Sequence, residues 1–162
     1  MIYLPDGPAH PTQEALDSFW ANARAVDSNL SDSYEVRWFG IDAETTQMIF
    51  DYIKDGVKVG TFTLPWILEN TGQSQAEAGQ PVILIDYDGT PTLVLRILES
   101  TTVAFGDIDA SITRLDGPAV QDPEIWKPLH QQFWEAQLAK FGLTVTDSMP
   151  VLVEKFELVY AA

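Results

Sequence analysis

Two apolar segments separated by a short turn sequence constrain the fold of this chain more than any other feature. The segment VILID, residues 82–86, is followed by YDGTP and then by TLVLRIL, residues 92–98. Asp-Gly between two apolar runs is a strong β-hairpin signal, because glycine accepts the positive φ angles of a tight turn. The sequence therefore predicts two antiparallel strands that are joined at Asp88 and Gly89.

The same stretch has a second interpretation, because phosphatases of the haloacid-dehalogenase type also place an apolar strand before Asp-x-Asp-Gly-Thr. Asp86 would then be the nucleophile and Asp88 the general acid. That chemistry requires a helix after the loop, and later strands that supply a hydroxyl, a lysine and an acidic pair for Mg²⁺. Pro91 and another apolar strand follow the loop here, so the hairpin interpretation is preferred.

The rest of the chain mixes helical and extended segments. Periodicity and capping signals predict helices at 11–27, 42–55 and 123–141, and extended segments at 34–39, 57–66 and 150–160. Asp42 and Asp122 are expected to cap the second and third helices. The elements do not alternate regularly, and no Gly-rich phosphate-binding motif is present. The sequence therefore predicts an α+β domain, with a small mixed or antiparallel β-barrel flanked by helices.

The charge of the chain limits the ligands that it can bind. Nine Lys and Arg face 24 Asp and Glu, which gives a net charge of −15. Nonspecific binding to nucleic acid comes mostly from neutralised phosphates, so a large nucleic-acid footprint is not expected. A small pocket with one or two cations is compatible with this charge.

Several chemistries lack the residues that they need. The chain has no cysteine and two histidines, so a thiol nucleophile is excluded and neither a metal site nor a cofactor is predicted. No apolar run is long enough to span a membrane, and the N-terminal residues lack the features of a signal peptide. A cytoplasmic protein without membrane contact is expected.

Six segments carry a resemblance to a known family. They are YEVRWFG (34–40), DYIKDGVKVGTFTLPW (51–66), GQPVILIDYDGTPTLVLRI (79–97), VAFGDIDA (103–110), the pattern W...H..FW (126–134) and DSMPVLVEKFELVY (147–160). In order and spacing they resemble the bacterial ASCH-domain family, which has a PUA-like β-barrel fold. The resemblance implies one compact unit, with an ASCH domain at 34–162 and an N-terminal helical extension at 1–33.

The resemblance also implies a function linked to RNA. PUA-like barrels bind RNA or modified bases, and ASCH relatives include single-strand ribonucleases and amidohydrolases that act on N4-acetylcytidine. The expected ligand is therefore a short single-stranded RNA or a nucleoside. A hydrolase and a non-catalytic RNA-binding, nucleotide-binding or regulatory module both remain open.

Three residues match or replace the catalytic positions of the family. Lys58 and Thr61 match its Lys and Thr, and Asp116 in LDGP stands where relatives often have a Glu. A partly buried Lys58 would be a general base, or a charged group that holds a phosphate or carbonyl oxygen. Thr61 is a candidate nucleophile or hydrogen-bond donor, provided that Gly60 allows both side chains to reach one pocket. Asp116 is expected to orient Lys58 or to protonate a leaving group.

Each of these residues also has a structural interpretation. Lys58 could be an ordinary exposed lysine, Thr61 a strand residue, and Asp116 a turn residue before Gly117. The sequence also departs from the family pattern, because Val59 replaces a hydroxyl residue of Lys-Thr-Ala-Thr.

Four further residues are candidates for substrate binding. Tyr52 and Trp66 flank the Lys58 segment and could stack on a base. Glu99 is a second candidate carboxylate, and Asp122 stands where many relatives have Ser. His130, one helical turn after Trp126, is expected to be a hydrogen-bonded packing residue.

Overall fold

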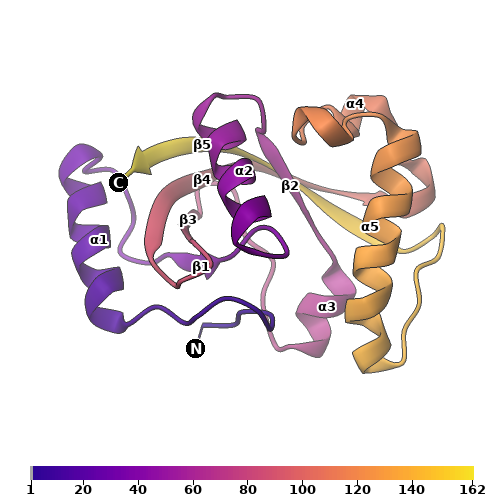
Figure 1. Cartoon of the computed structure of the whole chain (residues 1–162), viewed down its shortest axis with the longest axis horizontal. Helices are drawn as coiled ribbons and strands as arrows, with labels where there is room; N and C mark the ends of the chain where they lie inside the picture. Colours follow the sequence, from indigo (N-terminus) through magenta and orange to yellow (C-terminus); the bar gives the residue numbers. More distant parts are fainter. Residues whose placement is uncertain (1) are drawn as a thin grey trace.

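The computed structural model describes residues 2–162 as one sheet with helices packed around it (Figure 1). The helices are α1 (Gln13–Val26), α2 (Ala43–Lys54), α3 (Pro65–Asn70), α4 (Ala110–Thr113) and α5 (Pro123–Leu138). The strands are β1 (Glu35–Arg37), β2 (Gly60–Thr63), β3 (Pro81–Ile85), β4 (Pro91–Ala104) and β5 (Pro150–Ala161). Three short 3₁₀ helices occupy Phe105–Asp107, Pro118–Val120 and Ala139–Phe141. The predicted combination of helices and a sheet is therefore confirmed.

The predicted hairpin is present. Strands β3 and β4 pair in antiparallel fashion, and the amide of Asp86 donates to the carbonyl of Thr90 at 2.9 Å. The Asp86 carboxylate accepts hydrogen bonds from the amides of Asp88 (3.0 Å) and Thr90 (2.9 Å). Gly89 has a φ of +83°, as such a turn requires. Asp86 is thus a turn residue, and no helix follows it as a phosphatase loop would require.

The five strands are arranged in the order β1-β3-β4-β5-β2. Strand β1 runs parallel to β3, and the other neighbours are antiparallel. Within residues 2–162, β1 and β2 pair with each other nowhere, so the sheet is open and the predicted closure into a barrel is not confirmed. The two edges are connected through side chains instead, because Arg37 of β1 and Thr63 of β2 both bind the carboxylate of Glu154.

The helix ends follow the capping signals. Asp42 accepts a hydrogen bond from the amide of Thr45 at 2.8 Å and caps α2, and Asp122 caps α5 in the same way through the amide of Glu124. The predicted extended segment 57–66 is wrong in part. Only Gly60–Thr63 form a strand, and Pro65 begins α3 because proline is favoured at the first helical position.

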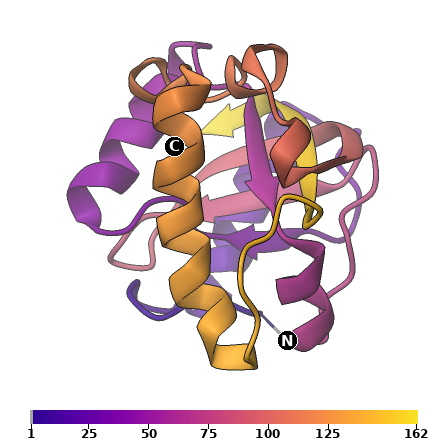
Figure 2. The same cartoon turned by 90° about the vertical axis from the view of Figure 1, so that its right-hand side faces the viewer.

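Three apolar clusters hold these elements together. In the first, Leu16 and Phe19 of α1 pack with Ile83 and Ile85 of β3, so the N-terminal helix shares its core with the sheet. The second cluster lies between α2 and the sheet, and the third lies beneath α5 around Trp126. Figure 2 shows α5 beside β2 on the side facing the viewer, and Figure 1 shows α1 at the opposite end of the molecule. No helix among residues 2–162 has the length and apolar character needed to cross a membrane.

Candidate functional site

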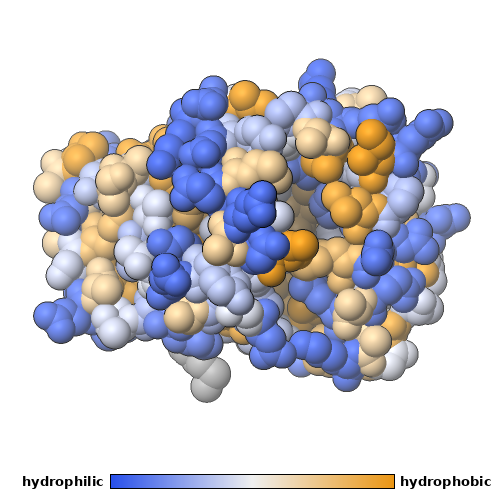
Figure 3. Space-filling view, viewed as in Figure 1, coloured by the Kyte–Doolittle hydropathy of each residue, from blue (hydrophilic) through white to orange (hydrophobic). Residues whose placement is uncertain are grey.

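A cavity of about 1020 Å³ lies between α2, β2 and α5 and reaches β1. The space-filling view shows the hollow beside α2, with apolar side chains on its rim (Figure 3). Ile41 is 65% exposed at this rim, and Met48, Leu129 and Phe133 are also exposed there. Lys58, Thr61, Asp116 and other polar residues line its interior.

The end of α2 places Lys58 at this cavity. Gly56 ends the helix with a φ of +73°, and the amides of Val57 and Lys58 both donate to the carbonyl of Tyr52. The amides of Val59 and Gly60 then donate to the carbonyl of Leu115 at 2.9 and 3.0 Å. These bonds bring the Lys58 segment alongside the loop that carries Asp116.

Gly60 allows this approach. A Cβ atom on Gly60 would lie 2.8 Å from the Cβ of Leu115, so a larger residue would push the two backbones apart. Glycine is therefore required at position 60 because the Gly60 backbone lies so close to Leu115. The sequence-based expectation was that a kink at Gly60 could bring Lys58 and Thr61 to one pocket. Both residues line this cavity, and the structure shows close packing of Gly60 against Leu115.

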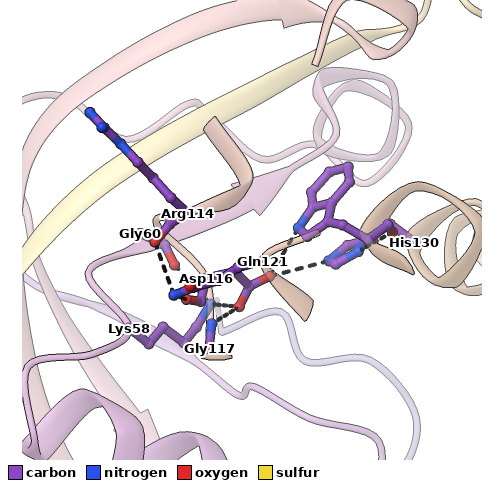
Figure 4. A network of polar contacts seen from close by, with 8 residues as sticks. Lys58, Gly60, Arg114, Asp116, Gly117, Gln121 and His130 are labelled. Atoms are coloured by element: carbon purple, nitrogen blue, oxygen red, sulfur yellow. Dashed lines mark hydrogen bonds and ion pairs between the residues drawn. The ribbon is translucent and has the colours of Figure 1, made fainter. Parts of the chain in front are cut away.

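Lys58 and Asp116 form a buried ion pair (Figure 4). Nζ of Lys58 donates to Oδ1 of Asp116 at 2.8 Å and to the carbonyl oxygen of Gly60 at 2.7 Å. The two residues are only 6% and 8% exposed. A lysine ammonium has three donors, so one N–H of Lys58 remains for an oxygen atom of a ligand.

Asp116 is surrounded by donors. Its Oδ1 also accepts from the amide of Gly117 at 2.8 Å, and its Oδ2 accepts from Nε1 of Trp126 at 3.0 Å. Burial opposes ionisation of this carboxyl, but the charge of Lys58 and these hydrogen bonds outweigh it and lower the pKa of Asp116. Asp116 is therefore a carboxylate at neutral pH, and it is poorly suited to protonate a leaving group.

His130 stacks on Trp126, with ring centroids 3.9 Å apart and an interplanar angle of 17°. Its Nδ1 lies 2.9 Å from the carbonyl oxygen of Trp126, and its Nε2 lies 3.7 Å from Oδ2 of Asp116. Burial lowers the pKa of His130, and the hydrogen bond to Trp126 only partly offsets this effect. The predicted hydrogen-bonded packing role is confirmed, but His130 also lines the cavity, which the sequence did not indicate.

Thr61 lines the same cavity, on β2. Its hydroxyl makes no hydrogen bond to Lys58 or Asp116 within residues 2–162. Thr61 is paired with Glu154 across the strands, and side chains at i and i+2 share a face, so Thr61 lies on the face of Thr63 and Glu154. Phe62, on the opposite face, contacts the ring of His130.

The proposed binding residues are divided between the cavity and other places. Tyr52 lines the cavity, and its ring packs against Gly117, where an added Cβ would lie 2.8 Å from Cδ2 of Tyr52. Trp66 packs on the apolar cluster beneath α5. Glu99 is exposed on β4 and pairs with Lys155 at 3.4 Å, and Asp122 is occupied as the cap of α5. The structure therefore does not bring these last three residues to the cavity.

The sequence reasoning did not select two charged residues that form a pair here: Arg37 lines the cavity, and Glu154 binds Arg37. Arg37 binds Glu154 through two hydrogen bonds of 2.8 and 3.0 Å, and its Nε binds Glu35 at 3.0 Å. Glu154 is fully buried. The sequence did contain a signal for this pair. Glu154 stands in the otherwise apolar first half of the strand segment 150–160, and a charged residue that is buried there needs a partner.

Comparisons with known proteins identify the family of this chain. A family model described as the ASCH domain matches residues 35–160. The chain belongs to the ASCH-domain family. A search of curated proteins found no match.

Two solved structures show the same fold as this ASCH-domain protein. One is a protein from Enterococcus faecalis V583, with a TM-score of 0.82 and 21% identity over 91% of this chain and 90% of the other. The second is an ASCH domain from Lactobacillus crispatus JV V101, with a TM-score of 0.80 and 17% identity over 93% of this chain and 96% of the other. At these identities the likeness concerns the fold alone.

Proposed function

We propose that this ASCH-domain protein is a PUA-like module whose cavity binds a nucleoside or a short single-stranded RNA and hydrolyses an acyl or phosphodiester bond there. The observation that carries the proposal is the buried pair of Lys58 and Asp116 at a cavity large enough for a nucleoside. Buried ion pairs in a cavity are candidate functional sites, because burial is costly unless the charges are used or well paired.

Lys58 acts in this proposal as a charged donor. Its ammonium already donates to Asp116 and to Gly60, so its remaining N–H is available to a carbonyl or phosphate oxygen. Negative charge that develops on that oxygen in the transition state would be stabilised by a donor that is already in place. This role fits the geometry better than that of a general base, which requires a neutral amine.

The surroundings suit a base better than a long polyanion. Aromatic rings of Phe39, Tyr52, Phe62 and Phe133 line the cavity, and such rings provide stacking surfaces for a base. The chain carries a net charge of −15, which repels an extended phosphate backbone. An N-acylated nucleoside is therefore the preferred substrate class, and a short single-stranded RNA is the second.

Turnover of N4-acetylcytidine and of a short single-stranded RNA tests the proposal. We expect release of cytidine by the wild type and a loss of at least about a hundredfold in Lys58→Ala, as for removal of an oxyanion donor. Lys54→Ala is the matched control, because Lys54 is the exposed last residue of α2, the helix that precedes Lys58, and does not line the cavity. Equal rates in the two variants would contradict the proposal.

A non-catalytic module is the second candidate. It is favoured by the hydroxyl of Thr61, which does not reach Lys58 or Asp116 through a hydrogen bond among residues 2–162. In that case neither substrate is turned over, and cytidine still raises the melting temperature of the wild type more than that of Lys58→Ala. Turnover that depends on Lys58 would exclude this second candidate.

A further inference from the structure

Hydrolysis at this cavity requires a group that accepts a proton from the attacking oxygen, and neither member of the ion pair is suited to that task. Nζ of Lys58 donates to two oxygen atoms and has no free electron pair as an ammonium. The Asp116 carboxylate already accepts from Lys58, Gly117 and Trp126, which makes it a weak base.

His130 has the free acceptor that the pair lacks. The carbonyl oxygen of Trp126 can only accept, so the proton of a neutral His130 is on Nδ1 and Nε2 carries an electron pair. Nε2 makes no hydrogen bond within residues 2–162, and the ring lines the cavity. An unprotonated imidazole nitrogen beside a buried ion pair is suited to general base catalysis.

Trp126 holds His130 and Asp116 at a fixed separation. Its carbonyl binds Nδ1 of His130, its ring stacks on the imidazole, and its Nε1 donates to Oδ2 of Asp116. Nε2 and Oδ2 are 3.7 Å apart and both are acceptors, so they do not hydrogen-bond to each other, and Oδ2 can accept a second hydrogen bond beside the one from Trp126. A molecule with two donors, such as water, can bind to both acceptors.

We propose that His130 is the proton acceptor of this site and that the group it activates is a water molecule held between His130 and Asp116. The proposal rests on the hydrolase function above, and it differs from attack by Thr61. Thr61 lines the same cavity, but within residues 2–162 its hydroxyl makes no hydrogen bond to His130, Lys58 or Asp116. The nucleophile in this proposal is therefore water.

The step balances for an N-acylated nucleoside. The water oxygen bonds to the acyl carbon, its proton moves to Nε2 of His130, and the carbonyl oxygen becomes negative beside Nζ of Lys58. When the C–N bond breaks, Nε2 returns the proton to the departing nitrogen. The products are a carboxylic acid and a nucleoside with a free amine.

The groups that face His130 define its pH dependence. Asp116 and Lys58 are the charged groups near its ring, and the contacts from β2 and α5 are the uncharged rings of Phe62, Trp126 and Trp134. His130 must be neutral to accept a proton, so the hydrolysis rate should fall as the pH is lowered. Because burial lowers the pKa of His130, this fall should lie at a lower pH than for an ordinary histidine.

The test compares His130→Ala and His130→Gln with His10→Gln, in the full chain and with N4-acetylcytidine. His10 is the other histidine and is exposed, so its substitution is the matched control. We expect a loss of at least about a hundredfold in both His130 variants, loss of the acid limb of the pH profile, and partial rescue of His130→Ala by free imidazole. A purely structural histidine would not give imidazole rescue.

Histidine-ring ¹⁵N NMR gives a readout that does not depend on turnover. We expect a neutral His130 with its proton on Nδ1 and a free Nε2 that responds to added cytidine, and no such response at His10. Wild-type turnover that persists in both His130 variants, or a proton on Nε2, would overturn the His130 proposal and leave the hydrolase function standing. Absence of wild-type turnover of both substrates would overturn the hydrolase function itself, and the His130 proposal with it.

Discussion

Arg37 and Glu154 are 117 positions apart in the sequence, yet their side chains form a two-bond ion pair across the sheet. Arg37 lies on the edge strand β1, and Glu154 lies on β5, which is separated from β1 by β3 and β4. Thr63 on the other edge strand, β2, donates to the same carboxylate. The Glu154 carboxylate therefore links the two edges of an open sheet that the backbone does not close.

Removal of Arg37 should destabilise the protein strongly. Arg37→Ala leaves the fully buried Glu154 without its counter-charge, and breaking a buried pair in this way costs roughly 3–5 kcal/mol. Urea unfolding of the variant and the wild type measures the difference. Arg24→Ala is the control, since Arg24 and Asp32 form an exposed pair that should contribute about 1 kcal/mol at most. Equal losses in the two variants would contradict the linking role of Glu154.

The charge of Asp116 should make stability depend on acid pH. Its pKa in the folded state is below the ordinary value of 3.8, so its contribution is fully present above that value and is lost as the pH falls through the lower, folded-state pKa. Asp116→Asn should remove this dependence and also lower stability at neutral pH, because Lys58 stays buried without a counter-charge. Unfolding free energies measured from about pH 7 down to about pH 2 test both effects. If the unfolding free energy of Asp116→Asn depended on acid pH as that of the wild type does, the dependence would come from another group.

Gly117 should control the position of the Tyr52 ring. In Gly117→Ala the new Cβ would lie 2.8 Å from Cδ2 of Tyr52, and overpacking of this kind costs about 1–3 kcal/mol. The displaced ring should weaken nucleoside binding at the cavity, as calorimetry would show. In the double variant Gly117→Ala/Tyr52→Ala the ring is gone and the clash with it. The stability losses of the two single variants should therefore not add in the double variant. Additive losses would show that the ring does not limit the substitution.

Asp86 should matter for the turn and not for activity. Asp86→Asn keeps a side-chain oxygen for the amides of Asp88 and Thr90, so the change in stability should be within about 0.5 kcal/mol. Asp86→Ala removes both hydrogen bonds and should cost about 1–2 kcal/mol. Thermal unfolding measures both values, and a large loss of turnover in Asp86→Asn would restore the phosphatase interpretation.

Part of the candidate site could be predicted from sequence. The resemblance selected Lys58, Thr61, Asp116 and Tyr52, and all four line one cavity. Orientation of Lys58 by Asp116 was one of two roles expected for Asp116, and the sequence could not decide between them. The contact depends on hydrogen bonds from the Val59 and Gly60 amides to the carbonyl of Leu115, a residue that is distant in the sequence.

Other site assignments required the tertiary structure. Trp66 was expected to flank the site in an extended segment, but Pro65 starts a helix there that packs Trp66 on the cluster beneath α5. Glu99 faces solvent on β4. His130 was expected to be a packing residue, and the proposal of a second role rests on its position 3.7 Å from Asp116 in the structure.

The sequence by itself determined the local elements of this protein: the hairpin at Asp88-Gly89, and the helix starts at Asp42 and Asp122. Turn and capping signals act over a few residues, so they are readable without knowledge of the fold. Tertiary structure alone decided the strand order, the open edges, the Arg37–Glu154 link and the grouping of His130 with Lys58 and Asp116. These features depend on contacts between distant segments, which packing of the whole chain selects and no local pattern encodes.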